Sequence, residues 1–359
     1  MLLFLHRRLQ EITGSSEIFG GLSIFTFGDL FQLPPHAQRA LFDQPSEEIA
    51  RLYGSLWKNH FKVVELQQIM RQRDDLSFAR LLNRVRSGQH TSDDVSTLCT
   101  RETNDPPEDI LHVYTTNKAV DNYNNKKLES LSTSKFVVRA QDSKKDVTTA
   151  VGARIILTYN VSTADGLVNG AKGTVKGFIP TPPTTADDNY TPNFILIEFD
   201  NPNIGHQTRI LYGRLLQHQS TVVPIVRQQV QVQLGKHSTV HAVRFQFPLT
   251  LAWATTIHKV QGETLNSIVI HCNGQFQPGQ LYVALSRVKS LNGLYLVNFD
   301  SQKIKTSAKT IAEMERLINS MKFFPPDTLS YLPDSNSMIS ISAVNAQSLH
   351  SHLLDLLIF

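Results

Sequence analysis

The feature of this sequence that most constrains its fold is a change of pattern that later reverses. Up to about residue 135, helical periodicity alternates with short apolar runs, and the same mixture returns after residue 248. Between residues 136 and 247 the chain shows short β-branched runs separated by turn residues, which is typical of a small β-barrel. A β-rich segment flanked on both sides by α/β elements indicates an insertion within one α/β domain.

Several segments carry the signal of a particular element. The apolar run 22–27, bounded by Gly28, predicts a strand buried on both faces, as in a parallel sheet. An amphipathic helix is expected at the start of the chain, and another from about Gln280. Further strands are expected at residues 110–114, 154–158, 173–175, 194–199, 226–234, 267–271 and 293–297.

Cysteine and apolar content exclude two classes of protein. The only cysteines among the 359 residues, Cys99 and Cys272, lie far apart without paired spacing, which argues against a disulfide scaffold and a cysteine-based zinc site. A reducing compartment is therefore expected. Because no window holds about 18 uninterrupted apolar residues, a membrane span is not expected either.

Positive charge is concentrated in one part of the chain. Residues 201–262 contain no Asp or Glu, yet they carry six Lys and Arg residues together with five histidines. Such a segment is the footprint expected of a surface that follows nucleic-acid phosphates. A solvated basic face explains the charge alone equally well, so both interpretations stay open.

Two early segments carry candidate phosphate-handling groups. Residues 28–35 read GDLFQLPP and follow the predicted strand 22–27, at the edge where open parallel sheets bind ligands. The amide of Gln32 offers a donor and an acceptor to a phosphate or a water molecule. Arg71 could stabilise charge on a transferring phosphoryl group, although a surface arginine is the plainer interpretation.

Two later segments are denser in polar groups. Residues 255–264 read TTIHKVQGET and offer phosphate donors, while Gly262 allows close approach of backbone to a nucleotide. His258 as a general base is less attractive because no partner carboxylate stands at a telling spacing; a buried structural histidine is the alternative. Arg287 flanks an apolar helix face, from which it could reach a ligand or form an ordinary salt bridge.

Four segments, taken together and in this order, resemble the helicase motifs of the Pif-type DNA helicases, relatives of the RecD helicases in superfamily one. These segments read GDLFQLPP (28–35), LQQIMRQ (66–72), TIHKVQGETL (256–265) and YVALSRV (282–288). The resemblance extends over about residues 1–300. It implies ATP-driven 5′ to 3′ translocation along single-stranded DNA, unwinding of duplex or forked DNA, and roles in DNA repair, recombination and telomere maintenance.

The resemblance also implies an α/β fold of P-loop NTPase (RecA-like) helicase domains, the first incomplete and the second interrupted by a small SH3-like β-barrel. Residues 1–60 would be the C-terminal remnant of the first RecA-like domain. The second RecA-like domain would comprise residues 61–145 and 248–324, and the SH3-like insertion would comprise residues 146–247. Residues 325–359 would form a tail.

Roles for single residues follow from the matched motifs. Gln32 would sense the γ-phosphate of ATP, and Arg71 and Arg287 would act as arginine fingers. The nucleotide would be bordered by Gly28, Asp29, Gln261, Gly262 and Glu263. Along the DNA strand would lie Asn117, Thr256, His258 and Lys259.

One departure from the family pattern concerns ATP and Mg²⁺. Such helicases need a glycine-rich phosphate loop ending in Gly-Lys-Ser/Thr and an Asp-Glu pair that holds Mg²⁺. Neither is found in these 359 residues. The expectation is therefore an N-terminally truncated helicase whose Mg²⁺ ligands lie in the missing part, with no metal ligands of its own and no ATP hydrolysis as written.

The tail gives a weaker resemblance. Residues 339–349 are similar to the first strand of the endonuclease/exonuclease/phosphatase fold, in which Asn345 would be the first active-site residue. No metal-binding carboxylate of that fold follows, so no nuclease activity is expected. A tail without a fold of its own is the favoured alternative.

Alternative functions remain at this point. A catalytically inactive remnant that binds single-stranded DNA is the main one, and an interaction scaffold built on the barrel is a weaker one. A monomer is expected, inside the cell, in the nucleus of a eukaryote or in the mitochondrion.

Overall fold

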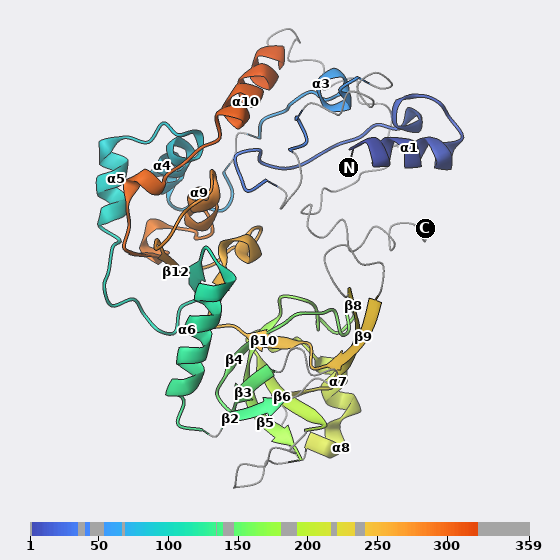
Figure 1. Cartoon of the computed structure of the whole chain (residues 1–359), viewed down its shortest axis with the longest axis vertical. Coiled ribbons are helices and arrows are strands. Elements are labelled where there is room, and N and C mark those ends of the chain that lie inside the picture. Colours follow the sequence, from blue (N-terminus) through green and yellow to red (C-terminus); the bar gives the residue numbers. More distant parts are fainter. Residues whose placement is uncertain are drawn as a thin grey trace. The chain divides into compact units, whose positions relative to one another are not determined.

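Two compact units make up the chain (Figure 1). The first combines Met1–Pro106 with Ile257–Phe359, and the second is Pro107–Thr256. The structure, a computed structural model, describes residues 2–34, 40–43, 54–66, 69–133, 135–138, 147–180, 192–216, 221–233 and 241–321. The five-part domain division expected from the sequence stays a prediction.

The first unit is mainly helical. Its α-helices are α1 (Leu2–Thr13), α3 (Leu56–His60), α4 (Leu76–Ser87), α5 (Ser92–Cys99), α9 (Gln280–Leu285) and α10 (Ala308–Met321). Its short 3₁₀ turns are η1 (Ile18–Gly21), η2 (Ile257–Val260), η3 (Leu291–Gly293) and η4 (Ser301–Lys303).

Helix α4 shows why these segments become helices. Its first turn is capped by Asp75, whose carboxylate accepts a hydrogen bond from the amide of Phe78, and it ends at Gly88 in the left-handed conformation. One face, which includes Phe78, Leu82 and Val85, is buried. The caps fix both ends of the helix, and the apolar face holds it against the rest of the unit.

Strands β12 (Ile268–His271) and β13 (Leu294–Val297) of this unit pair in parallel. The other side of β13 is bridged by a short segment near Glu102, because Leu296 donates to the carbonyl of Arg101 at 2.9 Å and accepts from the amide of Thr103 at 2.8 Å. The strands expected at 267–271 and 293–297 are therefore confirmed.

The second unit joins a small α/β element to a larger β-sheet. Strand β1 (His112–Tyr114) pairs in parallel with β11 (Ala254–Thr256), and helix α6 (Asn117–Ser130) packs on both. The side chain of Asn124, 4% exposed, ties the helix to β11: its oxygen accepts from the amide of Ala254 at 2.8 Å, and its nitrogen donates to the carbonyl of the same residue at 3.2 Å.

The larger sheet is antiparallel and five-stranded, in the order β10-β4-β5-β6-β7. Its strands are β10 (Leu249–Leu251), β4 (Arg154–Leu157), β5 (Lys172–Ile179), β6 (Phe194–Phe199) and β7 (Val223–Ile225). The described part of the unit also has strand pairs β2 (Lys135–Val138) with β3 (Val147–Ala150) and β8 (Gln228–Gln233) with β9 (His241–Gln246), and helices α7 (His206–Leu211) and α8 (Gly213–Leu216).

Alternation of side chains gives this sheet one apolar face. Ile155, Val175, Ile195 and Ile197 are at most 1% exposed and belong to a single core cluster. Burying one such side chain stabilises the fold by about 1.5–3 kcal/mol, so the cluster is the main source of stability in this part of the chain. The strands expected at 154–158, 194–199 and 226–234 are confirmed with shifts of at most two residues at an end, and the strand expected at 173–175 is longer than predicted, Lys172–Ile179.

The expectation of a buried strand at residues 22–27 is wrong. This segment is irregular, and Phe25 and Phe27 are 39% and 62% exposed. Strand backbone requires a neighbouring strand to take up its N–H and C=O groups, and no strand within the described ranges lies beside this segment.

The tail 325–359, with Asn345, lies outside the described residues. Helices within the described ranges are all too short or too polar to cross a lipid bilayer.

Candidate functional site

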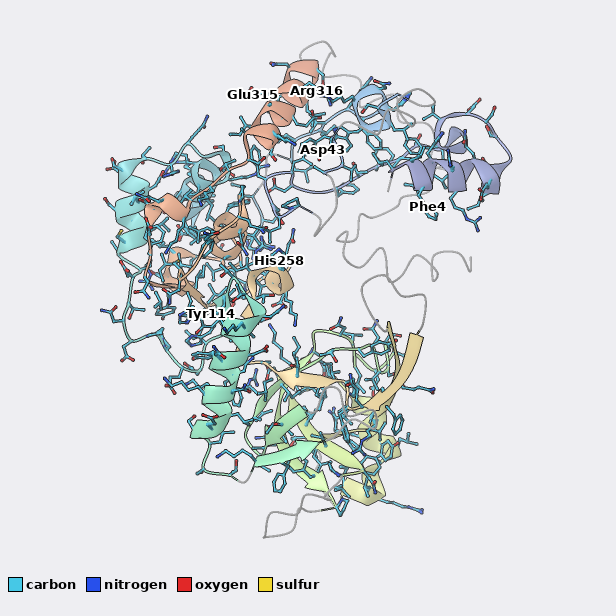
Figure 2. All side chains as sticks on the ribbon, in the orientation of Figure 1. Phe4, Asp43, Tyr114, His258, Glu315 and Arg316 are labelled. Carbon is cyan, nitrogen blue, oxygen red and sulfur yellow. The ribbon has the colours of Figure 1, made fainter. Side chains whose placement is uncertain are left out.

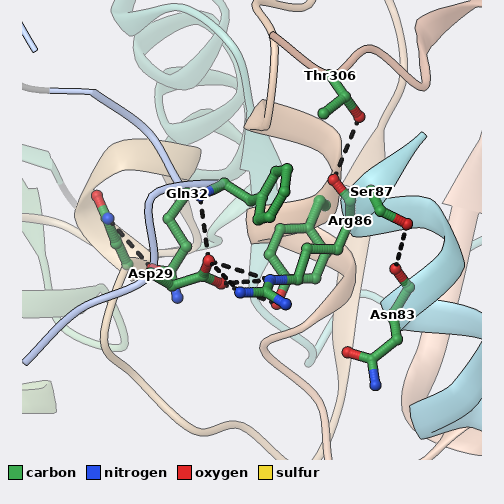
Figure 3. A network of polar contacts seen from close by, with 9 residues as sticks. Asp29, Gln32, Asn83, Arg86, Ser87 and Thr306 are labelled. Atoms are coloured by element: carbon green, nitrogen blue, oxygen red, sulfur yellow. Dashed lines mark hydrogen bonds and ion pairs between the residues drawn. The ribbon is translucent and has the colours of Figure 1, made fainter. Parts of the chain in front are cut away.

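The loop that carries Gln32 is shaped by Asp29. Its carbonyl accepts from the amide of Gln32 at 3.1 Å, and its carboxylate accepts from the amide of Phe31 at 3.1 Å. The same carboxylate receives a side-chain hydrogen bond from Arg86 on α4 (Figure 3). It also receives one from Tyr282 on α9. The turn is therefore held by its own backbone and by two helices.

Gln32 meets the third sequence motif. The half-buried Gln32 oxygen accepts a hydrogen bond at 3.3 Å from the amide nitrogen of Gln261, which directly follows η2. Gly262 is exposed with φ +91°, and a side-chain carbon at that position would find no atom within 4 Å. Glu263 is half-buried. The backbone at Gly262 is thus open to an approaching group.

Arg71 lies next to the fourth motif. Its Nε donates to the hydroxyl of Thr264 at 2.9 Å, and its Nη1 donates to the carbonyl of Ser286 at 3.1 Å. Burial lowers the pKa of this guanidinium below its ordinary value. The neighbouring Gln72, 6% exposed, donates to the carbonyl of Ser286 at 3.3 Å and to that of Val288 at 2.7 Å. Residues 71 and 72 are therefore both bound to the end of α9.

Arg287 shares Ser286 with Arg71. Its Nη2 donates to the Ser286 hydroxyl at 2.6 Å and its Nε to the carbonyl of Val283 at 2.7 Å. It is 1% exposed, and burial followed by the charge of Arg71 lowers its pKa to about 10. Both guanidiniums remain protonated at neutral pH, and these bonds run to neutral oxygens. Two neighbouring cations stabilised in this way suit an anionic ligand.

The expected DNA-contacting residues lie in both units. In the second unit, Asn117 is exposed at the first turn of α6, whereas Thr256 on β11 is 7% exposed and does not present its side chain to solvent. In the first unit, the half-buried His258 lies on η2 (Figure 2), and the exposed Lys259 follows it on the same turn. No DNA role of these residues is tested by the geometry.

The described residues suit a phosphate group better than a metal ion. No cluster of three or more His, Cys, Asp or Glu side chains able to hold a metal occurs among them. The carboxylate of Asp29 is already occupied by Arg86. The described residues therefore do not fit Mg²⁺. The pair Arg71 and Arg287, with Gln32 nearby in the same unit, does fit a polyphosphate.

Sequence reasoning missed the residues that support this site. Arg86 stands 57 positions from its partner Asp29, and Gln72 stands 214 positions from Ser286. A pattern in the sequence does not reveal such pairings. For Tyr282 and Ser286, their presence within YVALSRV was the one available signal.

The known proteins that are similar to this chain agree with one another in kind, although no protein-family model matches the sequence. The chain is 30% identical over 317 residues to the ATP-dependent DNA helicase PIF1 of Xenopus laevis, an alignment that covers 83% of this chain and 44% of that protein. The chain thus spans less than half the length of this curated relative.

Solved structures give the same result. A Bacteroides Pif1 helicase in complex with ADP-AlF3 and single-stranded DNA matches with a TM-score of 0.62 and 28% identity, over 89% of this chain and 72% of that one. A structure describing two coordinating Pif1 helicases at forked double-stranded DNA matches with the same TM-score and identity, over 89% and 71%. These neighbours confirm the α/β RecA-like helicase fold expected from the sequence.

Proposed function

The chain belongs to the Pif1-type family of DNA helicases, and from this premise we propose that Gln32, Arg71 and Arg287 act on the phosphates of ATP. The observation that carries the proposal is the hydrogen bonding of Arg71 and Arg287 to one residue, Ser286. Segments more than 200 positions apart in the sequence thereby present two cations together.

The chemistry follows from the charges. ATP brings phosphate anions to the two adjacent guanidiniums, and charge spread over a transferring phosphoryl group is stabilised by arginine in this way. Gln32 orients a phosphate oxygen or a water through its amide, while Gln261, Gly262 and Glu263 border the nucleotide. Gly28 and Asp29 belong to the loop that holds Gln32. Because Arg287 is 1% exposed, its head group has to move outward to touch a ligand.

For the whole protein we propose ATP-dependent 5′ to 3′ DNA unwinding, with single-stranded and duplex or forked DNA as partners. The acid-free segment 201–262 supports this, because phosphates favour such a surface. We also propose that Asn117, Thr256, His258 and Lys259 follow the DNA strand, for which the buried side chain of Thr256 has to become exposed. We propose further that the β-rich insertion is SH3-like. We propose further that the protein is an intracellular monomer of the nucleus or the mitochondrion. It would act in DNA repair, recombination or telomere maintenance.

A second candidate function is a single-stranded DNA-binding protein without ATP turnover. It is favoured by the lack of a Gly-Lys-Ser/Thr phosphate loop in the sequence. DNA-stimulated release of phosphate by the 359-residue chain would support the helicase motor and exclude the second candidate. Absence of release is expected from both candidates, because these residues hold no Gly-Lys-Ser/Thr phosphate loop.

The direct test measures ATP binding by titration calorimetry for the wild-type chain, Arg71→Ala and Arg73→Ala. Arg73 is the matched control, since its side chain is 69% exposed and its closest acid, Asp74, stands 3.7 Å away. Loss of one charge-assisted contact should weaken ATP binding about 10–100-fold in Arg71→Ala. Arg73→Ala should bind as wild type does. Equal affinities of all three proteins would contradict the phosphate site.

A further inference from the structure

We infer that Arg86 and Tyr282 are positioning residues that hold the loop 28–33, and with it Gln32, against the helix that leads to Arg287. The link to ATP rests on the proposed function, whereas the anchoring of the loop does not. Neither residue is expected to touch the nucleotide. They would act through Asp29, which directly precedes the turn that carries Gln32.

Two side chains that bind Asp29 form what we call the anchor of the loop, and the Arg86–Asp29 ion pair is its first part. The guanidinium forms a fork: its Nη2 lies 2.9 Å from Oδ1 of Asp29, and its Nε lies 3.0 and 3.1 Å from the two carboxylate oxygens (Figure 3). The two side chains are only 23% and 18% exposed. The guanidinium carbon also lies 4.7 Å from the centre of the Phe31 ring. Because the planar guanidinium binds through two nitrogens, the pair restricts the rotation of the two side chains as well as the distance between them.

Tyr282 is the second part of the anchor. Its hydroxyl donates to the other carboxylate oxygen of Asp29 at 3.3 Å. Burial, followed by the charge of Asp29, raises the pKa of this phenol, so the proton needed for donation is retained. Tyr282 lies in α9, and Arg287 follows that helix by two residues. The loop is therefore bound to the same element that presents the arginine.

The start of α9 adds a steric constraint. Gly279, at φ +77°, lies so close to the loop that a Cβ there would stand 2.4 Å from the carbonyl oxygen of Phe31 and 3.3 Å from that of Gln32. Contact of backbone with backbone leaves little room for the loop to shift. Together with the bonds to Asp29, it fixes the loop from two directions.

The base of the anchor is rigid. Arg86 projects from α4, whose buried face was described above, and its carbonyl accepts from the hydroxyl of Thr306 at 3.2 Å. With its carboxylate receiving Arg86, Tyr282 and the Phe31 amide, Asp29 is engaged on both oxygens. We therefore assign Asp29 to anchoring the loop rather than to contact with the nucleotide.

Helix α4 itself provides a matched control. Arg84, two residues before Arg86, forms a similar fork with Asp94 on α5, at 2.7 and 2.5 Å. Substituting Arg84 also removes a bidentate ion pair from the same helix, but that pair does not reach the loop 28–33. Effects that arise only in the Arg86 variant are then specific to the loop.

The first experiment is hydrogen–deuterium exchange of the 359-residue chain, followed by mass spectrometry. Amide exchange in a peptide covering residues 29–33 should be about tenfold faster in Arg86→Gln than in wild type, with a smaller increase in Tyr282→Phe and in Arg86→Lys. Arg84→Gln should leave this peptide unchanged. The anchor is refuted if Arg86→Gln exchanges there no faster than Arg84→Gln.

The second experiment measures ATP affinity of the same variants. With the anchor broken, ATP should bind Arg86→Gln several-fold more weakly, and Arg86→Lys should recover part of the loss. Faster exchange with unchanged ATP affinity would overturn the link between the anchor and the site. If wild type itself fails to bind ATP, the proposed function fails, while the exchange experiment still decides on the anchor.

Discussion

Replacing Gly279 with alanine tests the contact between α9 and the Gln32 loop. The added carbon would stand 2.4 Å from the Phe31 carbonyl oxygen, a distance at which backbone atoms have to move. Gly279 also has φ +77°, where any side chain adds strain. The substitution therefore combines a conformational cost with a steric one.

The two costs can be separated with Gly14→Ala. Gly14 has a similar φ of +66°, but a Cβ there would meet no atom within 4 Å. The free energy of unfolding of Gly14→Ala should therefore fall only by the conformational part, about 1–2 kcal/mol. The free energy of unfolding of Gly279→Ala should fall by a further amount of about 1–3 kcal/mol, because the added carbon overpacks the contact. Since about 1 kcal/mol shifts the melting temperature by roughly 2–4 °C in a unit of this size, a clear difference is expected.

Scanning calorimetry of wild type, Gly14→Ala and Gly279→Ala measures the melting temperature. The transition of the first unit should fall several degrees further in Gly279→Ala than in Gly14→Ala. ATP binding of Gly279→Ala should weaken as well, because the loop that carries Gln32 is pushed away. Equal melting temperatures of the two variants would refute the close packing of loop and helix.

Three further predictions concern other parts of the chain. Burial lowers the pKa of His112 from 6.5 to about 4, so the unfolded chain binds a proton that the folded chain does not. Stability should fall by up to about 2 kcal/mol between pH 6.5 and 5 in urea titrations, and an unchanged slope in His112→Phe would contradict this. Iodoacetamide at mildly alkaline pH should modify exposed Cys99 but not Cys272, whose pKa burial raises to about 12, until denaturant is added; two labelled thiols in the native chain, counted by mass spectrometry, would disprove it. Asn124→Ala should cost about 2–3 kcal/mol in thermal unfolding, because the buried amide and carbonyl of Ala254 lose their partner; a loss near zero would exclude that role.

The β-rich part of the fold could be predicted well from the sequence. Strand 154–157 alternates half-buried and buried side chains, a period-2 pattern that is local information, and 194–199 is a short apolar run that buries three residues in a row. The run 22–27 has the same apolar character yet forms no strand, because strand formation depends on a neighbour that composition does not reveal.

The site could be predicted only in part. The order of four motifs indicated the family, which the comparisons support, and it named Gln32, Arg71 and Arg287, whose roles stay predictions. The pairing of Asp29 with Arg86 could not be foreseen, since it joins a loop to a helix through tertiary packing. Nor did the sequence indicate that Arg287 would be buried, because a guanidinium is normally exposed.

The bridge between Glu102 and Leu296 has a consequence for solubility. A strand with one unpaired side can recruit a strand from another molecule and so start aggregation. Here a turn after α5 takes up the backbone groups of Leu296 in the middle of β13. That strand is thereby shielded from pairing with a second copy of the chain.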